Sequence, residues 1–360
     1  MKKYAVVLAA GKGTRMKSLD VNKPKSAYEI FGKPLISYVL DALSVANVDK
    51  TVVVIGVGGD EINAIVNDRA ETVVQKKING TAKAVETASE LLAKKKGSTI
   101  VACGDTPLIR GKTIEDLFEY HELNKFDMTI ATMIVEDPTG YGRIVRGKKS
   151  EVLKIVEDKD ASLQEKKILE VNSGLYVFNN QYLFEYLKHI KSNNNQKEYY
   201  LTDIVNLFNK SKKQVGAFVV NNQEEMFGIN DRKQLAYAHK IIQKRVNEEL
   251  MLSGVTIEDA RTAYISPDVK IGQDTTIRPN TTILGNSEIG TNNIIGPNSY
   301  LKNVKIGNSN KILSSWLENY SCNNNCEIGP FVKRTEKDSE IVNQVDNKDI
   351  KKPRTRKGNK

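Results

Sequence analysis

The 360-residue sequence predicts an α/β domain with a mainly parallel sheet, followed by a long helix and a short parallel β-helix. Three observations lead to this fold class. Strand-like and helix-like segments alternate over the first 228 residues, one long helical pattern follows, and aliphatic residues then recur about every six positions. We expect a first domain at 1–228, a linker helix at 229–254, a β-helix at 255–332 and a basic, disordered tail at 333–360.

The first domain opens with a continuous apolar run at 4–10, which is typical of a strand buried on both faces. Apolar residues at helical spacing predict helices at 35–46 and 82–93. Further strands are expected at 51–57, 99–103, 129–135, 174–178 and 215–220. Strands that alternate with helices in this way indicate a parallel sheet with helices packed on it.

A single helix is expected over 231–252, because an Asn-Asp pair precedes it and Ser253 and Gly254 close it. Beyond it, aliphatic side chains repeat at Ile265, Ile271, Ile277, Ile283, Ile289, Ile295, Leu301, Ile306 and Ile312. This spacing is the hexapeptide repeat of a parallel β-helix, in which each hexad forms one side of a triangular coil. We expect about three coils, with the start of a fourth near Ile328.

Composition excludes several classes of protein. Hydrophobic residues make up 39% of the chain, and no run approaches the roughly 20 apolar residues of a membrane span. The apolar start is too short for a signal peptide, so we expect a cytoplasmic protein with no membrane partner. Three cysteines are too few for a disulfide framework, and Cys322 and Cys326 lack neighbouring ligands for zinc.

The net charge of +10 suits anionic substrates and also nucleic acid, so its location matters. Residues 333–360 carry ten Lys or Arg against five Asp or Glu, which places half of the excess in the tail. A basic end of this kind is more often solvated than a nucleic-acid arm. We therefore expect an anionic small molecule, rather than nucleic acid, as the partner.

The first motif is Leu-Ala-Ala-Gly-Lys-Gly-Thr-Arg-Met at 8–16, with Lys-Pro-Lys at 23–25. A dinucleotide-binding fingerprint needs glycine at Met16, and a Walker loop needs glycine before its Lys-Ser, so Met16 excludes both. What remains is a strand, a glycine turn and two cationic side chains, Arg15 and Lys25. Glycines let backbone N–H groups approach phosphate oxygens closely, and the two cations add charge against a triphosphate.

The second motif is Cys-Gly-Asp-Thr-Pro-Leu-Ile at 103–109, which begins at the end of an apolar strand. Asp105 therefore lies at the carboxyl edge of the expected sheet, where ligands of open α/β sheets bind. A carboxylate at this edge can hold Mg²⁺, which prefers few protein ligands together with phosphate oxygens.

These segments resemble the signature of sugar-1-phosphate nucleotidyltransferases. From about residue 4 to about residue 332 the chain is similar to the bifunctional N-acetylglucosamine-1-phosphate uridylyltransferase / glucosamine-1-phosphate acetyltransferase family. The resemblance implies a Rossmann-like nucleotidyltransferase domain, a long helix and a left-handed β-helix. It also implies a Mg²⁺-dependent enzyme that makes UDP-N-acetylglucosamine and pyrophosphate from UTP and N-acetylglucosamine-1-phosphate.

The resemblance also assigns roles to individual residues. It makes Arg15 and Lys25 catalytic and places the metal on Asp105 and Asn230. It assigns substrate binding to Leu8, Ala9, Ala10, Gly11, Gly13, Gln75, Gly80, Thr81, Cys103, Gly104, Gly142, Glu157 and Asn172. The chain departs from the family at Lys83, where His is usual, and at Cys103, where Tyr is frequent.

The family carries a longer β-helix with a second, acetyl-CoA-dependent site on later coils. Hexads here stop near 328–331, so we expect no acetyltransferase activity. The short β-helix either forms the homotrimer that the resemblance implies or caps the long helix. Two other functions stay open: a glucose-1-phosphate uridylyl- or thymidylyltransferase, and a regulatory subunit that binds partners without catalysis.

Overall fold

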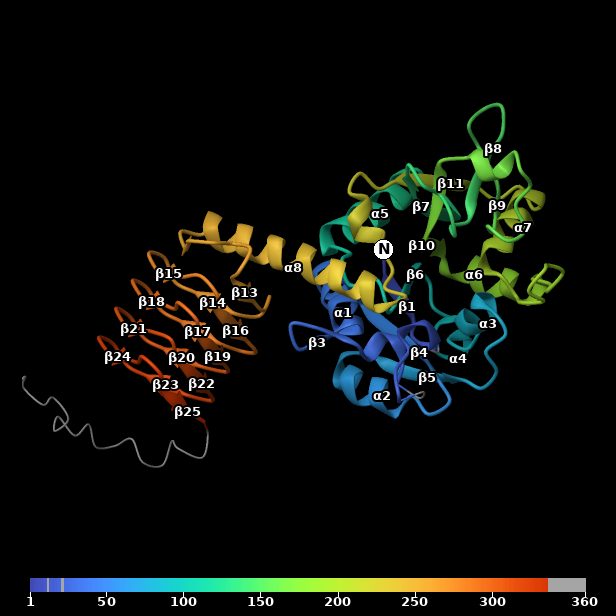
Figure 1. Ribbon diagram of the computed structural model, residues 1–360. Coiled ribbons are helices and arrows are strands. Elements are labelled where there is room, and N and C mark those ends of the chain that lie inside the picture. The colour runs from blue at the N-terminus through green and yellow to red at the C-terminus, as the bar shows by residue number, and fades with distance from the viewer. Residues whose placement is uncertain (12, 21–22, 336–360) are drawn as a thin grey trace, which may run out of the picture. The chain divides into compact units, whose positions relative to one another are not determined.

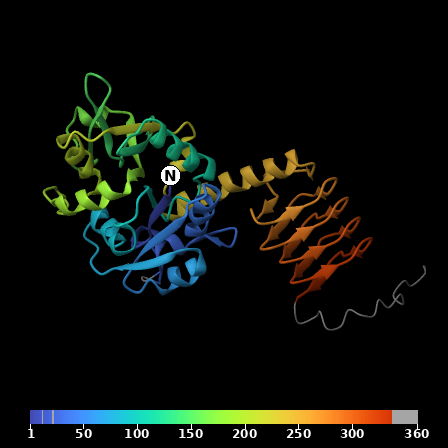
Figure 2. The ribbon, with the colours of Figure 1, turned by 180° about the vertical axis from the view of Figure 1, so that it is seen from behind.

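The computed structural model describes residues 1–11, 13–20 and 23–335, so all but the first three residues of the predicted tail lie outside it. The chain forms two compact units that divide between Ile241 and Ile242 (Figures 1 and 2). The division falls inside helix α8 (Arg232–Leu252), close to where the sequence predicts one helix between two domains.

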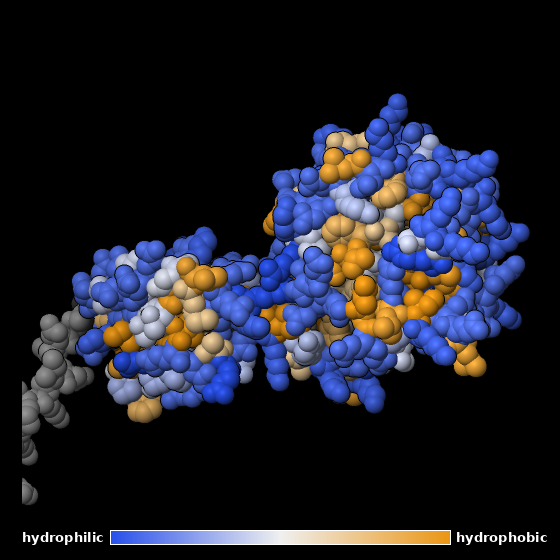
Figure 3. All heavy atoms as spheres, turned by 90° about the horizontal axis from the view of Figure 1, so that it is seen from above, coloured by the Kyte–Doolittle hydropathy of each residue, from blue (hydrophilic) through white to orange (hydrophobic). Residues whose placement is uncertain are grey.

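On the face seen in Figure 3, hydrophilic residues predominate in both units and apolar residues gather in separate patches. None of the helices in the described ranges is both long enough and apolar enough to span a membrane. Buried hydrophobic residues form two interior clusters in the first unit, and aliphatic residues such as Ile265, Ile283 and Leu301 are buried in the second.

The described part of the first unit contains a nine-stranded sheet whose main path runs β11-β7-β10-β6-β1-β4-β5. Only β10 runs antiparallel to its neighbours on this path, so the prediction of a mainly parallel sheet is confirmed. The bounds are β1 (Lys3–Leu8), β4 (Lys50–Gly56), β5 (Glu71–Gln75), β6 (Ser98–Cys103), β7 (Met128–Ile134), β10 (Glu170–Asn179) and β11 (Val215–Val219). A hairpin joins this path through β10, and its strands are β8 (Arg143–Arg146) and β9 (Val152–Val156).

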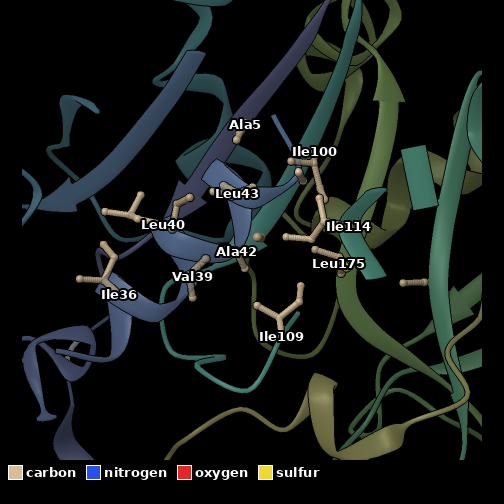
Figure 4. Packing of buried hydrophobic residues seen from close by; sticks show 14 of the residues in the cluster. Ala5, Ile36, Val39, Leu40, Ala42, Leu43, Ile100, Ile109, Ile114 and Leu175 are labelled. Atoms are coloured by element: carbon tan, nitrogen blue, oxygen red, sulfur yellow. The ribbon is translucent and has the colours of Figure 1, made fainter. Parts of the chain in front are cut away.

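Helices cover both faces of the sheet. They are α1 (Leu35–Val45), α2 (Asp60–Val66), α3 (Thr81–Glu86), α4 (Ser89–Leu92), α5 (Gly111–Leu123), α6 (Asn180–Tyr186) and α7 (Ile204–Lys210). Alternate residues of β1 belong to different clusters: Ala5 and Val7 pack with α1 and α5, and Tyr4 and Val6 pack with α3 and α4. Figure 4 shows side chains of α1 beside those of β1 and β6. Burial on both faces explains why the run at 4–10 is apolar without alternation.

The helix predicted over 82–93 is two short helices, α3 and α4. Thr87, at the break, donates its hydroxyl to the carbonyl oxygen of Ala84, which offers the backbone an alternative to continued helix. The helix predicted over 231–252 is a single element. Its start is capped by Asp231, whose Oδ1 accepts from the N–H of Gln234 at 2.8 Å.

The second unit is a parallel β-helix, consistent with the left-handed form that the hexapeptide repeat predicts. Its strands form three sheets, β12-β15-β18-β21-β24, β13-β16-β19-β22-β25 and β14-β17-β20-β23. The repeat positions pair with one another between coils, as in Ile265 with Ile283 and Leu301 with Leu317. The bounds are β12 (Thr256–Ile257), β13 (Tyr264–Ile265), β14 (Lys270–Ile271), β15 (Thr276–Ile277), β16 (Thr282–Leu284), β17 (Glu288–Ile289), β18 (Ile294–Ile295), β19 (Tyr300–Lys302), β20 (Lys305–Ile306), β21 (Lys311–Ile312), β22 (Trp316–Glu318), β23 (Ser321–Cys322), β24 (Glu327–Ile328) and β25 (Lys333–Arg334).

The expectation of about three coils is too low, because two sheets contain five strands each within the described residues. The step of six residues is strict only from Ile265 to Leu301. Steps of five lead to Ile306, Leu317 and Cys322, and Ile257 lies eight residues before Ile265. The six-residue period therefore marks the middle of the β-helix and not both of its ends. The last described strand, β25, lies two residues past the predicted end at 332.

Buried amides tie the coils of the β-helix together. Asn293 and Asn310 are almost wholly buried, and Oδ1 of Asn293 accepts from the backbone N–H and the Nδ2 of Asn310 at 2.8 and 3.0 Å. Nδ2 of Asn293 donates to the carbonyl oxygen of Gly307 at 2.9 Å. Since a buried polar group without a partner costs about 1–3 kcal/mol, these side chains fix the stacking of neighbouring coils.

We predict that Asn293→Ala lowers the free energy of unfolding of the β-helix by roughly 2–3 kcal/mol, because it leaves several buried groups unpaired. Urea unfolding followed by fluorescence measures this, since Trp316 is the one tryptophan of the sequence and lies in this unit. Asn286→Ala, at an exposed turn, is the control and should leave the midpoint unchanged. Equal midpoints for both variants would show that the buried amides contribute little.

Candidate active site

Two cavities adjoin each other at the carboxyl edge of the sheet, beyond the ends of β1, β4, β5 and β6. The larger measures about 580 Å³ and the smaller about 280 Å³, and both are lined by Ala10, Gly11, Gln75 and Ile78. The larger is also lined by Ala9, Pro24, Gly56, Val57, Gly58, Gly59 and Lys76, and the smaller by Leu8, Lys25, Ser26, Gly80, Thr81, Ala84, Cys103, Asp105 and Glu198. Parallel strands bring these loops together because their carboxyl ends share one edge.

Most of the residues predicted for nucleotide binding line these cavities. A Cβ added at Gly11 would meet nothing within 4 Å, so this part of the turn faces open space. Gly13 and Gly104 line neither cavity and instead allow close packing. A Cβ at Gly13 would lie 3.4 Å from the Cα of Lys25, and one at Gly104 would lie 3.0 Å from the Oγ of Ser26. These two glycines shape the loops that carry the charged residues.

Gln75, the last residue of β5, presents an unused hydrogen-bond donor to the cavities. Its side chain is only 4% exposed, and its Nε2 has no hydrogen-bond partner among the described residues. A buried donor without a partner is costly, so it is a natural contact for a ligand that brings an acceptor. The carbonyl oxygens of a pyrimidine base are acceptors of this kind.

Gly80 and Thr81 are fixed by the segment 198–203. Gly80 has φ of +123°, and a Cβ there would lie 2.4 Å from the carbonyl oxygen of Tyr199, so the position requires glycine. The hydroxyl of Thr81 accepts from the N–H of Leu201 at 2.9 Å. Lys83, where the chain departs from the family, pairs with Glu86 at 2.5 Å and lies over the ring of Tyr199, outside both cavities.

Four charged or amide side chains from distant parts of the chain meet beside the glycine turn. The ammonium of Lys25 is ion-paired with the carboxylate of Asp105 and donates to the Oδ1 of Asn230 at 3.0 Å. The same Oδ1 accepts from the Nη2 of Arg15 at 2.7 Å. Asn230 is held in place because its backbone N–H donates to the Oε1 of Gln234 at 2.7 Å. The structure therefore brings together the two residues predicted for metal binding and the two predicted to be catalytic.

The donor set of this cluster fits Mg²⁺. One carboxylate and one amide oxygen already converge on a single cation, the Lys25 ammonium. Within the described ranges there is no group of three or more His, Cys, Asp or Glu side chains placed to hold a metal. A metal here would take few ligands from the protein and the others from phosphate oxygens and water, which is the usual manner of Mg²⁺.

Gly142, Glu157 and Asn172 form a second group that the structure also brings together. A Cβ at Gly142 would lie 3.5 Å from the Oε2 of Glu157 and 3.6 Å from the Cβ of Asn172. Asn172 donates its Nδ2 to the Tyr176 hydroxyl at 2.7 Å, and Glu157 accepts from the Thr202 hydroxyl at 3.0 Å. The pairing of β10 with β7 shifts its register between Asn172 and Tyr176. Irregularities of this kind, such as β-bulges, are frequent next to active sites.

Burial governs the protonation of this second group. It raises the pKa of Glu157, and the neighbouring Asp160, Asp203 and Asp158 raise it further, while the hydrogen bond from Thr202 opposes them. Burial likewise raises the pKa of Cys103, which lines the smaller cavity, to about 12. This cysteine is therefore a neutral thiol and not a nucleophile.

Sequence reasoning missed several of the lining residues. The turn at 56–59 lines the larger cavity and follows a predicted strand, so its glycines at the same sheet edge were a usable signal. Glu198 lines the smaller cavity, and Tyr176 and Thr202 bond to the predicted sugar-side residues. The run Glu-Tyr-Tyr-Leu-Thr-Asp at 198–203 resembles the family, but the expectation for it is a structural role in packing the sugar-side lobe. No local pattern marks Tyr176, whose role depends on how β10 packs.

Comparison with known proteins agrees with this arrangement. Residues 4–227 match the nucleotidyl transferase family, and residues 268–303 match the bacterial transferase hexapeptide family of six repeats. The chain is 41% identical over 329 residues to the bifunctional protein GlmU of Shouchella clausii strain KSM-K16, which covers 91% of this chain and 72% of that protein. It is 44% identical over 330 residues to GlmU of Lactobacillus helveticus strain DPC 4571, covering 92% and 71% respectively. GlmU of Listeria monocytogenes serotype 4a strain HCC23 is 42% identical over 330 residues, covering 92% and 72%.

We predict a pH signature for Glu157. Because its pKa is raised, the folded state holds this proton more tightly, and the wild type loses stability as pH rises above the ordinary value of 4.5. Glu157→Gln removes that loss, so the stability of the variant relative to wild type should increase between about pH 4.5 and neutrality. Urea unfolding across this range measures the difference.

Glu165→Gln is the matched control. The pKa of Glu165 is lowered to about 2, chiefly by the hydrogen bonds from Lys154 and Ser162, so its contribution is complete above pH 4.5 and is lost only at more acidic pH. Its stability difference from wild type should stay constant over the same range. A constant difference for Glu157→Gln as well would contradict the raised pKa.

Proposed function

The chain belongs to the nucleotidyl transferase family and, within it, to the family of the bifunctional protein GlmU, and from this membership we propose that it joins UTP and N-acetylglucosamine-1-phosphate into UDP-N-acetylglucosamine, with release of pyrophosphate. The observation that carries the proposal is the meeting of Arg15, Lys25, Asp105 and Asn230 beside the glycine turn. The adjoining cavities give room for a nucleotide on one side of this cluster.

The proposed reaction is a direct in-line displacement at the α-phosphorus of UTP. A phosphate oxygen of the sugar-1-phosphate forms the new P–O bond, the bond to the β-phosphate oxygen breaks, and pyrophosphate takes its electron pair. The attacking oxygen is already anionic, so no general base is required. Catalysis then rests on alignment and on neutralising crowded negative charge, which is the task of Arg15 and Lys25.

Asp105 and Asn230 would hold Mg²⁺, in keeping with the divalent metal that nucleotidyltransferases of this family use. When bound, the ion would neutralise phosphate oxygens and bring the two reacting phosphates together. The side chains themselves contribute two fixed oxygens beside the cations, and Asn230 is positioned by Gln234.

The second group suits the sugar. Glu157 and Asn172 offer hydrogen-bonding groups to sugar hydroxyls, and the lack of a side chain at Gly142, where a Cβ would meet the Cγ2 of Ile155 at 3.0 Å, lets its backbone lie close to both. Gln75 offers its free Nε2 to a carbonyl oxygen of uracil. This division, base near β5 and sugar near β10, supports a nucleotide and a sugar phosphate as substrates, and the resemblance to N-acetylglucosamine-1-phosphate uridylyltransferases is the basis for the N-acetyl group.

Two other functions are less well supported. A glucose-1-phosphate uridylyl- or thymidylyltransferase would share the glycine turn, but it would not be expected to combine the run Thr-Gly-Tyr-Gly-Arg at 139–143 with Asn-Ser-Gly at 172–174 as this chain does. A regulatory subunit without catalysis would be expected to lack the charged cluster, which is present here.

The β-helix supports a proposal of a homotrimer. The outward residues along its β13-β16-β19-β22 sheet include Tyr264, Tyr300 and Trp316, and the last two stack with their ring centroids 4.0 Å apart. Tyr264 and Trp316 are 46% and 44% exposed, so this face presents aromatic surface that a second copy could cover. We place the enzyme in the cytoplasm, where UTP is available.

The function is tested by pyrophosphate release from UTP and Mg²⁺ with N-acetylglucosamine-1-phosphate, glucosamine-1-phosphate and glucose-1-phosphate in parallel. We expect the N-acetylated sugar to give the highest kcat/KM. We also expect Lys25→Ala and Asp105→Ala each to reduce turnover by at least about 100-fold, the usual loss on removing one preorganised group.

Asp116→Ala is the matched control, because Asp116 lies on α5 and pairs with Lys112 at 2.8 Å, away from both cavities. It should keep wild-type turnover. Near-wild-type turnover of Asp105→Ala would end the metal assignment, and a preference for glucose-1-phosphate would replace the proposed substrate.

The proposal also includes the absence of acetyl transfer by these 360 residues, because no acetyltransferase motif can be matched in them. Incubation of the pure protein with acetyl-CoA and glucosamine-1-phosphate should release no free thiol above the rate without enzyme. Enzyme-dependent thiol release that depends on the sugar phosphate would show the prediction to be wrong.

A further inference from the structure

The Lys25 ammonium contacts the side-chain oxygens of Asp105 and Asn230, which are the oxygens proposed to hold a divalent cation. It is ion-paired with Asp105 and is 3.0 Å from the Oδ1 of Asn230, and Arg15 adds a third contact to the same oxygen. A cation of the protein itself therefore satisfies the oxygens that are proposed to hold the metal. This matters because an unpaired carboxylate at this depth would be costly.

The ion pair is partly shielded from water. The side chains of Lys25 and Asp105 are 19% and 14% exposed, so their attraction is screened less than that of a surface pair. Lys25 follows Pro24 in a short helical turn, and Gly13 packs directly against its backbone. The ammonium is thus held near Asp105 from a fixed backbone position.

A divalent cation and this ammonium cannot both occupy the oxygens of Asp105 and Asn230, because like charges at such short separation repel strongly. The ammonium must first move to another anion. The triphosphate that the adjoining cavities are proposed to hold is such an anion, and Lys25 lines the smaller cavity.

Resting on the proposed function, we propose that Lys25 is a resident cation that keeps divalent metal out of the nucleotide-free site and releases Asp105 and Asn230 when it turns to the triphosphate. Lys25 then has two opposing effects. It increases the rate of turnover, and it decreases the affinity of the free protein for metal. Since coupling between two ligands is reciprocal, metal and nucleotide bind with positive cooperativity.

The test is Mn²⁺ binding to the full chain without nucleotide, measured by the electron paramagnetic resonance of free Mn²⁺. Wild type should bind Mn²⁺ weakly. Lys25→Met and Lys25→Gln should each bind it at least about tenfold more tightly, as expected for loss of a cation next to a divalent site. Lys25→Arg keeps the charge and should bind as weakly as wild type.

Two controls locate the effect. Lys23→Met removes a nearby lysine that pairs with Glu61 at 3.6 Å, and it should leave Mn²⁺ affinity unchanged. Adding Asp105→Asn to Lys25→Met should abolish the gain. Circular dichroism identifies a variant that fails to fold, and the Met and Gln replacements serve as independent tests of the same charge.

Unchanged or weaker Mn²⁺ affinity in folded Lys25→Met and Lys25→Gln would overturn the inference, as would equally tight binding by Lys25→Arg. This readout needs neither UTP nor sugar phosphate. If the wild type transfers uridylyl groups while the Lys25 variants gain no Mn²⁺ affinity, the proposed function stands and the resident-cation role falls. If the Lys25 variants gain Mn²⁺ affinity but no sugar phosphate reacts, the resident-cation role stands and the proposed function falls.

Discussion

The parallel pairing of β1 with β4 on one side and β6 on the other is the constraint on which the site depends. Leu8 and Cys103 are register partners, so the glycine turn and the loop that carries Asp105 leave the sheet side by side. Pairing with β4, which in turn pairs with β5, adds the 56–59 turn and Gln75 to the same edge. Burial on both faces holds β1 in this register, since a slip by one residue would exchange the side chains packed on each face.

The charged cluster and the sugar-side group follow different electrostatic principles. At the first, opposite charges compensate one another and leave oxygens and cations that a ligand can rearrange. At the second, burial together with neighbouring carboxylates favours the proton on Glu157, and a hydroxyl of Thr202 opposes it. The segment 198–203 connects the smaller cavity with the second group, because Leu201 bonds to Thr81 while Thr202 bonds to Glu157. A change in this segment would therefore affect both places.

Much of the fold was predictable because its signals are local and strong. The apolar run of β1, the cap of α8 and the six-residue repeat each depend on neighbouring residues only. The break at Thr87 was missed because the N–H groups of Thr87 and Ala88 bond three residues back, which the spacing of apolar residues does not reveal. The outer coils were missed because the step is irregular outside Ile265–Leu301. In the site, glycines and charges marked the nucleotide side, whereas the bond of Tyr176 to Asn172 and the place of Glu198 beside the smaller cavity depend on tertiary packing.

Within the described residues, the ladders of the β-helix join each coil to the coils directly before and after it. Stability in such an array is close to a sum of local terms, so the number of coils is a separable trait. Coils can be gained or lost at one end of the stack while the ladders at the other end keep their partners. The length of this unit can therefore vary among relatives without disturbing the geometry at the edge of the nucleotidyltransferase sheet.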